Sequence, residues 1–570
     1  MSGSFSWVDW TVVGALLLLT TWVGHRAAGR PSTLKEFFLG GRRLPWFAVA
    51  ASIVATEISA VTFISLPSVV AREGGNWTYL QIGLFGSLFA KGLIAWFLVP
   101  AYYEREVFSP YDYMGSKLGE GVRRTATALF TLGGVLGQSA RVYLTAVVLE
   151  VLLAEELAWA CSYVSLSPLS LSVAVIVLVA MLWTLMGGIA TVVWTDAVLF
   201  LLFLAGIGAA LSTVGGAVEG GVMGALDAGW EAGKLQLFDL RFDFAEPYTL
   251  WAAIIASTWG GIAFYGTDQL LAQRVLCCRD VRDARKAVLA SYAAMLVTAL
   301  VAVVGVGLWA YYQEHMMSEV ARGLYSEKPD RIFPIFVVEA MPTGLKGLVV
   351  AGALAAAISS LDSIVAALSQ TSLSLLRRGA ESARDLSDSR KLVVFWSLAL
   401  GLAAVGIDVL AESYASILDL ALAMASYTGG ALLAGFLLSF LPLKTDAEGY
   451  AVSSVLSVLV VFAVTSHQAW GARLGVSPTL IVQCAGAALI FYWWLTTRER
   501  SLKRALALLI GVCGAWLLAA HGVLRPEEIS GEARVLAWPW FIPLGSTVAF
   551  VWTLLLSSPV LKSAGELKDS

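Results

Sequence analysis

A run of serines inside an apolar segment holds the residues best suited to chemistry. Between Gly347 and Ser363 the chain reads GLVVAGALAAAISSLDS. Ala356, Ser359, Ser360 and Ser363 recur at i, i+3, i+4 and i+7, so they share one face of a helix. Hydroxyl groups inside a membrane need partners, and hydroxyl and carbonyl oxygens are suitable ligands for sodium. The alternative is plain helix packing, because small residues line many transmembrane interfaces.

The composition is that of a protein with many membrane-spanning helices. Of its 570 residues, 58% are hydrophobic and 14% are charged, and the mean hydropathy is +0.77. A spanning helix needs about 20 apolar residues, and about fifteen such segments are predicted, with centres near residues 16, 57, 90, 138, 178, 202, 260, 299, 357, 401, 428, 458, 487, 512 and 547. The five cysteines form no metal-binding spacing and are expected to be unpaired. No basic tract suggests a nucleic-acid partner.

The connections between these segments predict the orientation of the protein. Lysine and arginine gather in alternate connections, at 26–43, 105–124, 274–286, 377–391 and 498–504. Basic connections of this kind stay on the cytoplasmic side. We therefore predict a multi-pass protein of the plasma membrane, with the N-terminus outside and the C-terminus in the cytoplasm.

Two predicted helices are interrupted at matching places. The second contains ATEIS followed by Pro67, and the seventh contains TWGG from Thr258 to Gly261. Breaks at corresponding positions of two halves are typical of secondary transporters built from inverted repeats. The prediction is a single membrane domain, 1–570, with an extra N-terminal helix at 8–25, a first repeat at 44–214, a second repeat at 248–441 and about four accessory helices at 449–556.

Four separated stretches carry a family resemblance. They read FFLGGRRLPWFAVAASIVATEISAVTFISLP (37–67), WTLMGGIATVVWTDAVL (183–199), FYGTDQLLAQRVLCCRDVRDARKAV (264–288) and MPTGLKGLVVAGALAAAISSLDS (341–363). Together they resemble the sodium/solute symporter family, which includes sodium-coupled sugar, proline, iodide and sialic acid carriers. ATEISAVTFISLP and NWTYLQIG look more like the sialic acid carriers. The resemblance implies an all-α fold like that of the leucine-transporter group, with ten core helices in a 5+5 inverted repeat.

The resemblance also implies a sodium site between the first and eighth core helices. Its ligands would be the backbone carbonyls of Ala55, Ile58 and Ala356 and the hydroxyls of Ser359 and Ser360. The break at ATEIS agrees with this assignment, because the last carbonyls of a helix have no donor within that helix. Sodium would then be the co-transported ion.

Some members of the family have a second sodium site near an aspartate of the fifth core helix. Asp196, in WTDAV, matches that aspartate, and its partners would be Ser359, Asp362 and Ser363. This chain has an acid, Asp362, where some relatives have a hydroxyl. The acid would either strengthen the binding of a second cation or bind a proton instead. The structural alternative for Asp196 is the N-terminal cap of a helix that starts near Ala197.

The substrate site is expected where the two breaks meet, between 57–62 and 258–264. Ser59 and Thr62 match substrate-facing positions of the sialic acid carriers, and Phe264 matches an inner-gate aromatic. The residues predicted to line the site are Glu57, Ser59, Thr62, Gln81, Lys91, Gln138, Arg141, Gly261 and Phe264. The charged groups among them are also candidates for internal pairing, Glu57 with either Lys91 or Arg141, because a lone charge in a membrane is costly.

The predicted function is sodium-coupled symport of a small organic solute by alternating access. The substrate class predicted is an organic anion or sugar acid. The alternatives are sugar or polyol symport, or a transporter-like membrane sensor without a kinase. No nucleophile–base constellation or metal motif indicates an enzyme. The expected partners are the solute, sodium and the lipid bilayer, and the sequence gives no oligomeric state.

Overall fold

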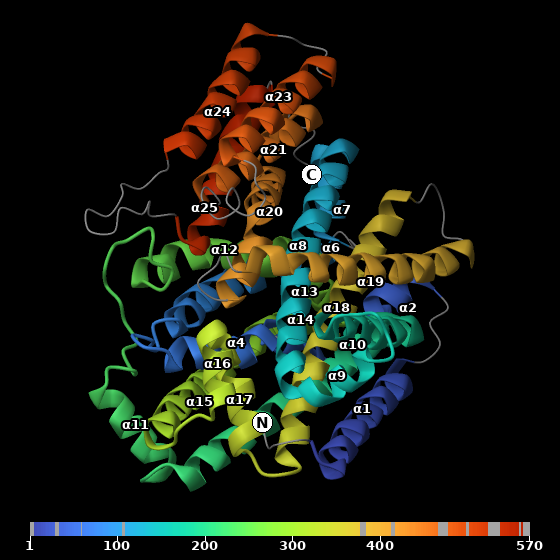
Figure 1. Ribbon diagram of the computed structural model, residues 1–570. Coiled ribbons are helices and arrows are strands. Elements are labelled where there is room, and N and C mark those ends of the chain that lie inside the picture. Colours follow the sequence, from blue (N-terminus) through green and yellow to red (C-terminus); the bar gives the residue numbers. More distant parts are fainter. Residues whose placement is uncertain are drawn as a thin grey trace. The chain divides into compact units, whose positions relative to one another are not determined.

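Helices make up nearly all of the computed structural model (Figure 1). It describes residues 5–28, 33–58, 60–104, 109–376, 383–411, 417–465, 477–496, 501–521, 536–557 and 560–561. Within these residues, thirteen helices are long and apolar enough to cross a membrane. The expectation of an all-α polytopic membrane protein is therefore confirmed.

The difference between fifteen predicted segments and thirteen observed spans lies in the two helices that were predicted to be interrupted. The segment near residue 57 consists of two helices, α3 (Trp46–Glu57) and α4 (Ala60–Ala71). The segment near residue 260 consists of a short α-helix, α12 (Thr258–Ile262), between the π-helices η4 (Ala252–Ser257) and η5 (Ala263–Thr267). The α3–α4 break is present at the predicted place. The predicted break at Thr258–Gly261 is wrong, because helical φ and ψ continue from Ser257 to Ala263 and the irregularity there is only a change between α-helical and π-helical hydrogen bonding.

The chain folds into two compact units, each described by itself. The first comprises Met1–Leu84, Gln138–Asp239 and Gln273–Ala421, and the second comprises Phe85–Gly137, Leu240–Ala272 and Leu422–Ser570. Four elements contribute residues to both, namely η2 (Ile82–Ser87), α8 (Glu120–Leu152), α13 (Gln269–Val275) and α20 (Ile417–Phe440). The bounds of the two predicted inverted repeats stay a prediction.

The first unit holds α3, α4 and the long helices that surround them. Its other elements are α1 (Trp7–Ala28), α2 (Leu34–Leu39), η1 (Gly40–Arg42), α9 (Ala154–Cys161), α10 (Pro168–Ala217), α11 (Gly221–Glu231), α14 (Val281–Ala290), η6 (Ser291–Ala293), α15 (Ala294–Glu314), α16 (Glu319–Glu327), η7 (Pro329–Arg331), α17 (Ile332–Ala340), α18 (Leu345–Leu376) and α19 (Ala383–Ala411). At the α3–α4 break, Ile58 has φ −87° and ψ 71°, a ψ value outside the helical range. α4 packs closely on α15, since a Cβ at Gly305 would lie 3.0 Å from the backbone of Pro67.

Helix α10 covers the two segments predicted near residues 178 and 202. Ser167 caps its start by accepting a hydrogen bond from the Ser170 N–H, and Pro168 occupies its first turn. The helix bends at Gly188, which has φ +62°. A Cβ there would lie 2.2 Å from the carbonyl oxygen of Phe37, so the position requires glycine both for its φ and for its space.

The second unit contains irregular helices and the C-terminal helices. Its other elements are α5 (Leu88–Leu93), the π-helix η3 (Ile94–Leu98), α6 (Val99–Glu104), α7 (Pro110–Leu118), β1 (Leu443–Lys444), α21 (Ala447–Thr465), α23 (Pro478–Thr496), α24 (Leu502–His521), η8 (Trp538–Trp540), α25 (Phe541–Leu556) and β2 (Val560–Leu561). α5 and α12 pack closely, because a Cβ at Gly261 would lie 2.6 Å from the Cβ of Ala90. π-Helical turns are frequent at functional sites.

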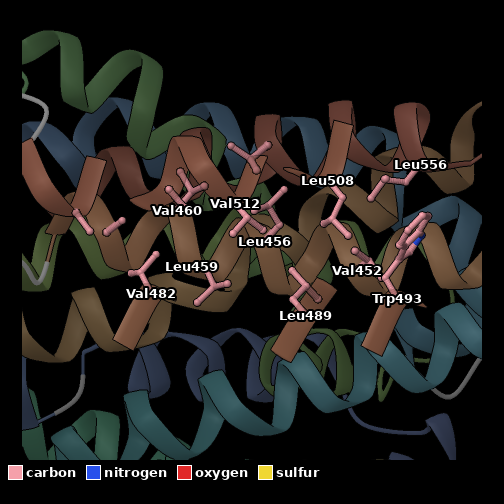
Figure 2. Close-up of a cluster of buried hydrophobic side chains, with 14 residues drawn as sticks. Val452, Leu456, Leu459, Val460, Val482, Leu489, Trp493, Leu508, Val512 and Leu556 are labelled. Atoms are coloured by element: carbon pink, nitrogen blue, oxygen red, sulfur yellow. The ribbon is translucent and has the colours of Figure 1, made fainter. Parts of the chain in front are cut away.

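Four C-terminal helices enclose an apolar core, called here the C-terminal apolar cluster (Figure 2). Its fourteen buried members come from α21, α23, α24 and α25: Val452, Leu456, Leu459, Val460, Ala463, Val482, Leu489, Trp493, Leu508, Val512, Ala515, Ala519, Val548 and Leu556. α24 approaches α21 at Gly511, where a Cβ would lie 2.5 Å from the Leu456 side chain. β1 and β2 pair antiparallel, with Leu443 opposite Leu561.

Candidate sodium site

Five buried side chains of the first unit form a hydrogen-bonded set, called here the buried polar cluster. They are Ser52 on α3, Asp196 on α10, Arg274 on α13, and Ser359 and Ser363 on α18. Asp196 and Arg274 form its centre as an ion pair, with Nη2 3.0 Å from Oδ2 and both side chains 0% exposed. Four helices that are far apart in the sequence therefore meet at one pair of charges.

Both oxygens of Asp196 accept hydrogen bonds. Ser52 Oγ donates to Oδ2 at 2.5 Å, and Ser359 Oγ donates to Oδ1. Arg274 Nε donates to Ser52 Oγ at 2.8 Å, and its Nη2 also donates to Ser363 Oγ. Ser363 Oγ in turn lies 2.5 Å from the backbone oxygen of Ser359. Charge-assisted bonds of this kind are the strong ones, and in a low-dielectric interior they hold the side chains in a single arrangement.

The residues predicted to bind sodium lie beside this cluster. α3 and α18 pack against each other, Ala55 lies one turn after Ser52, and Ile58 stands at the break, where the last carbonyls of α3 lack donors within the helix. Ser359 and Ser360 are both buried on α18. Ala356 lies on the same helix, and its side chain is outside the described set.

Ser360 provides the test of whether sodium fits this site. Its Oγ is buried and has no hydrogen-bond partner among the residues that the structure describes. A buried hydroxyl without a partner is unfavourable. A desolvated cation held by this oxygen and by the carbonyls of the α3 break would give it one, so the donor set fits sodium.

Asp362 is the second carboxylate near the cluster. Its side chain is completely buried, and Oδ1 lies 3.2 Å from Ser363 Oγ. Oδ2 is also buried and has no hydrogen-bond partner in the described part of the chain. The four residues predicted for a second sodium, Asp196, Ser359, Asp362 and Ser363, are thus brought together, and Arg274 lies among them.

The helix-cap interpretation of Asp196 is wrong. The alternative required a helix that starts near Ala197, whereas Asp196 lies well inside α10, which begins at Pro168 and bends at Gly188. A cap needs a non-helical residue whose side chain meets the free N–H groups of the first turn. Asp196 instead accepts its hydrogen bonds from side chains of other helices.

Sequence reasoning missed the role of Arg274. It counted this residue among the basic groups of a cytoplasmic connection, but the guanidinium is entirely buried. The available signal was the sequence LLAQRVL, in which Arg274 follows Gln273 within an otherwise apolar stretch, an unusual setting for a residue type that is mostly exposed. Gln273 on the same turn is also buried and donates to the backbone oxygen of Phe38 at 2.7 Å.

The residues predicted for the substrate are divided between the two units. In the first unit, Glu57 ends α3, Thr62 is buried on α4, Gln81 donates to the Thr78 carbonyl at 3.2 Å, and Gln138 and Arg141 are buried on α8. In the second unit, Lys91 is buried on α5, Gly261 lies on α12 and Phe264 lies on η5. Ser59 lies outside the described residues. Lys91 Nζ stands 4.9 Å from the ring centroid of Tyr265, which is a cation–π distance.

Comparison with known proteins gives the family. A family model described as the sodium:solute symporter family matches residues 37–457. The chain belongs to the sodium:solute symporter family. It is 25% identical to the sodium-coupled monocarboxylate transporter 2 of Bos taurus over 495 residues, covering 84% of this chain and 76% of that one. It is also 25% identical to the sodium/sialic acid symporter of Proteus mirabilis (strain HI4320) over 466 residues, covering 80% and 90%.

A third relative and a solved structure agree with this assignment. The human sodium/iodide cotransporter is 26% identical over 493 residues, covering 84% of this chain and 73% of that one. The substrate-bound, outward-open structure of a sodium-coupled sialic acid symporter superposes with a TM-score of 0.71, at 20% identity, covering 96% and 97% of the two chains. The predicted family and the leucine-transporter-like fold are confirmed, and the family makes sodium the co-transported ion.

Proposed function

We propose that this protein is a sodium-coupled symporter that carries a small organic anion across the plasma membrane by alternating access, with its N-terminus outside and its C-terminus in the cytoplasm. Membership of the sodium:solute symporter family supports the coupling ion. The observation that carries the proposal is the buried hydroxyl of Ser360, which has no hydrogen-bond partner in the described part of the chain and lies on α18, the helix that packs against α3. All the relatives named above are transporters, which supports transport rather than catalysis.

Sodium would be bound by oxygens from two elements. The proposed ligands are the backbone carbonyls of Ala55, Ile58 and Ala356 and the hydroxyls of Ser359 and Ser360. Carbonyls at a helix break and hydroxyls on a facing helix replace water around the ion. An ion that needs both elements favours the conformation in which they are close, and this is how its binding would be coupled to the solute.

A second cation remains part of the proposal. The set predicted from the family resemblance is Asp196, Asp362 and Ser363, together with Ser359, and within it we propose Asp362 as the acid that holds the ion. The Asp362 carboxylate is buried beside the buried polar cluster, in which the Arg274 guanidinium already pairs with Asp196. A further cation would balance the second carboxylate, because an uncompensated charge in the interior is unfavourable.

The proposed substrate class rests on buried cations and on the relatives. Each unit has a buried, positively charged side chain within a predicted membrane span. These side chains are Arg141 in the first unit and Lys91 in the second. Either cation would suit the carboxylate of a substrate. By their names, the relatives carry monocarboxylates, sialic acid and iodide, which are anions. Glu57, Ser59, Thr62, Gln81, Gln138, Gly261 and Phe264 complete the proposed set of substrate residues.

Uptake by purified protein in proteoliposomes tests this function. An inward sodium gradient should drive accumulation of labelled monocarboxylates or sugar acids, and the same gradient of potassium should not. Neutral sugars and polyols are measured in the same way, as controls for the anionic substrates. Sodium-driven uptake of the neutral solutes alone would contradict the anion class, and uptake that ignores sodium would contradict symport.

A further inference from the structure

We infer that Arg274 is a built-in cation at Asp196, and that this ion pair positions the hydroxyl of Ser359 for sodium instead of holding a second sodium itself. Asp196 and Arg274 are then positioning residues of the sodium site. The inference rests on the proposed sodium site at Ser359 and Ser360 and assigns it a fixed electrostatic support.

The first step is the position of the guanidinium. Arg274 Nη2 bonds both Asp196 Oδ2, at 3.0 Å, and Ser363 Oγ, and its Nε bonds Ser52 Oγ at 2.8 Å. Two of the four predicted ligands of the second sodium therefore already receive hydrogen bonds from a fixed positive charge. A sodium ion held by Asp196 and Ser363 would compete with these bonds and would face repulsion from the guanidinium.

The second step is the effect of Asp196 on Ser359. Ser359 Oγ donates its single proton to Asp196 Oδ1. With the proton fixed in that direction, the lone pairs of the oxygen point away from the carboxylate and stay available to a cation. A partner that orients a metal ligand in this way typically changes metal affinity by about 10–100-fold when it is removed.

The third step is the contrast with Asp362. Within the described residues Asp362 forms no hydrogen bond with Arg274, whose charge acts on it only at a distance, and its buried Oδ2 has no hydrogen-bond partner there. The two carboxylates therefore differ in role. Asp196 is neutralised by an internal cation, and Asp362 is the acid to which a second co-transported cation would bind.

Sodium activation and coupling ratio in proteoliposomes test this division. For Asp196→Asn, we expect the half-activating sodium concentration to rise about tenfold or more, while the Hill coefficient and the number of charges moved per substrate stay as in the wild type. Asp196→Glu, which keeps the charge, should recover part of the lost sodium affinity. Asp362→Asn is the matched control, in which the charges moved per substrate should fall by one.

The opposite pattern overturns the inference. If Asp196→Asn transports with one charge fewer per substrate, Asp196 is a ligand of the second cation. If Asp196→Asn fails to fold, the double variant Asp196→Asn/Arg274→Gln, which removes both charges together, is measured in the same way with the same expectation. Failure of the proposed function is recognised separately, because the wild type itself would then show no sodium dependence.

Discussion

The buried polar cluster of the first unit and the C-terminal apolar cluster of the second are both closed to solvent, but they are held together by different forces. The polar cluster depends on one ion pair and on hydroxyls in fixed orientations. The apolar cluster depends on the close packing of fourteen hydrophobic side chains (Figure 2). Packing tolerates changes that conserve volume, whereas a charge pair in a dry interior does not tolerate the loss of one partner. The comparison teaches that the proposed functional residues lie in the part of the interior that tolerates substitutions least.

The largest effect is expected from Arg274→Gln. Removal of the guanidinium leaves the Asp196 carboxylate buried without its counter-charge, which typically costs about 3–5 kcal/mol. We expect a large drop in the thermal unfolding temperature of the purified protein in detergent. The double variant Arg274→Gln/Asp196→Asn should recover most of this loss. If the single and double variants are equally unstable, the ion pair is not what holds the cluster.

A smaller loss of stability is expected from Leu456→Ala in the apolar cluster. Leu456 is fully buried on α21 beside Gly511, so its truncation leaves a cavity. The cost should be about 2 kcal/mol, at the low end of the usual range for such changes, because lipid tails are as apolar as leucine. Thermal unfolding measures the loss. The half-activating sodium concentration should stay that of the wild type, and a change in it would show that the two clusters are not independent.

Ser360→Ala should change sodium activation and leave stability nearly unchanged, the reverse of Leu456→Ala. The loss of one oxygen ligand should raise the half-activating sodium concentration about tenfold, which corresponds to about 1.4 kcal/mol, with little change in thermal unfolding. Ser369→Ala is the matched control, because Ser369 is also buried on α18 with no hydrogen-bond partner among the described residues, but nine residues further on. Equal sodium activation in both variants would remove Ser360 from the site.

The smallest effect concerns Cys277, one turn after Arg274. Burial raises the pKa of this thiol to about 12, and the thiolate is the reactive form. At pH 7 to 8 a variant that keeps only Cys277 should therefore react with maleimide much more slowly than one that keeps only the half-buried Cys161. Its labelling rate should rise with pH over the range in which the protein stays folded. Fast labelling at pH 7 would mean that the segment that follows Arg274 opens readily.

Much of this arrangement follows from local sequence patterns. The serine spacing on α18 and the break near residue 57 depend on residues close together in the chain, and both are found where they were predicted. The helix near residue 260 has α-helical and π-helical turns in place of the predicted break. The bend of α10 at Gly188 and the ion pair between Asp196 and Arg274 depend instead on contacts between distant segments. Hydropathy and charge patterns depend on residue type alone and cannot distinguish a buried arginine from a cytoplasmic one. They therefore assign Arg274 to the cytoplasmic connection.

The central claim is that sodium and an organic anion cross the membrane together, and the most direct test is the reverse coupling. An inward gradient of the transported anion is imposed on proteoliposomes at zero membrane potential, and entry of labelled sodium is measured without a sodium gradient. Coupling between two ligands is reciprocal. The account predicts that the anion gradient drives sodium inward above its equilibrium level, with a much reduced effect in Ser360→Ala at low sodium. Sodium entry that is the same with and without the anion would contradict it.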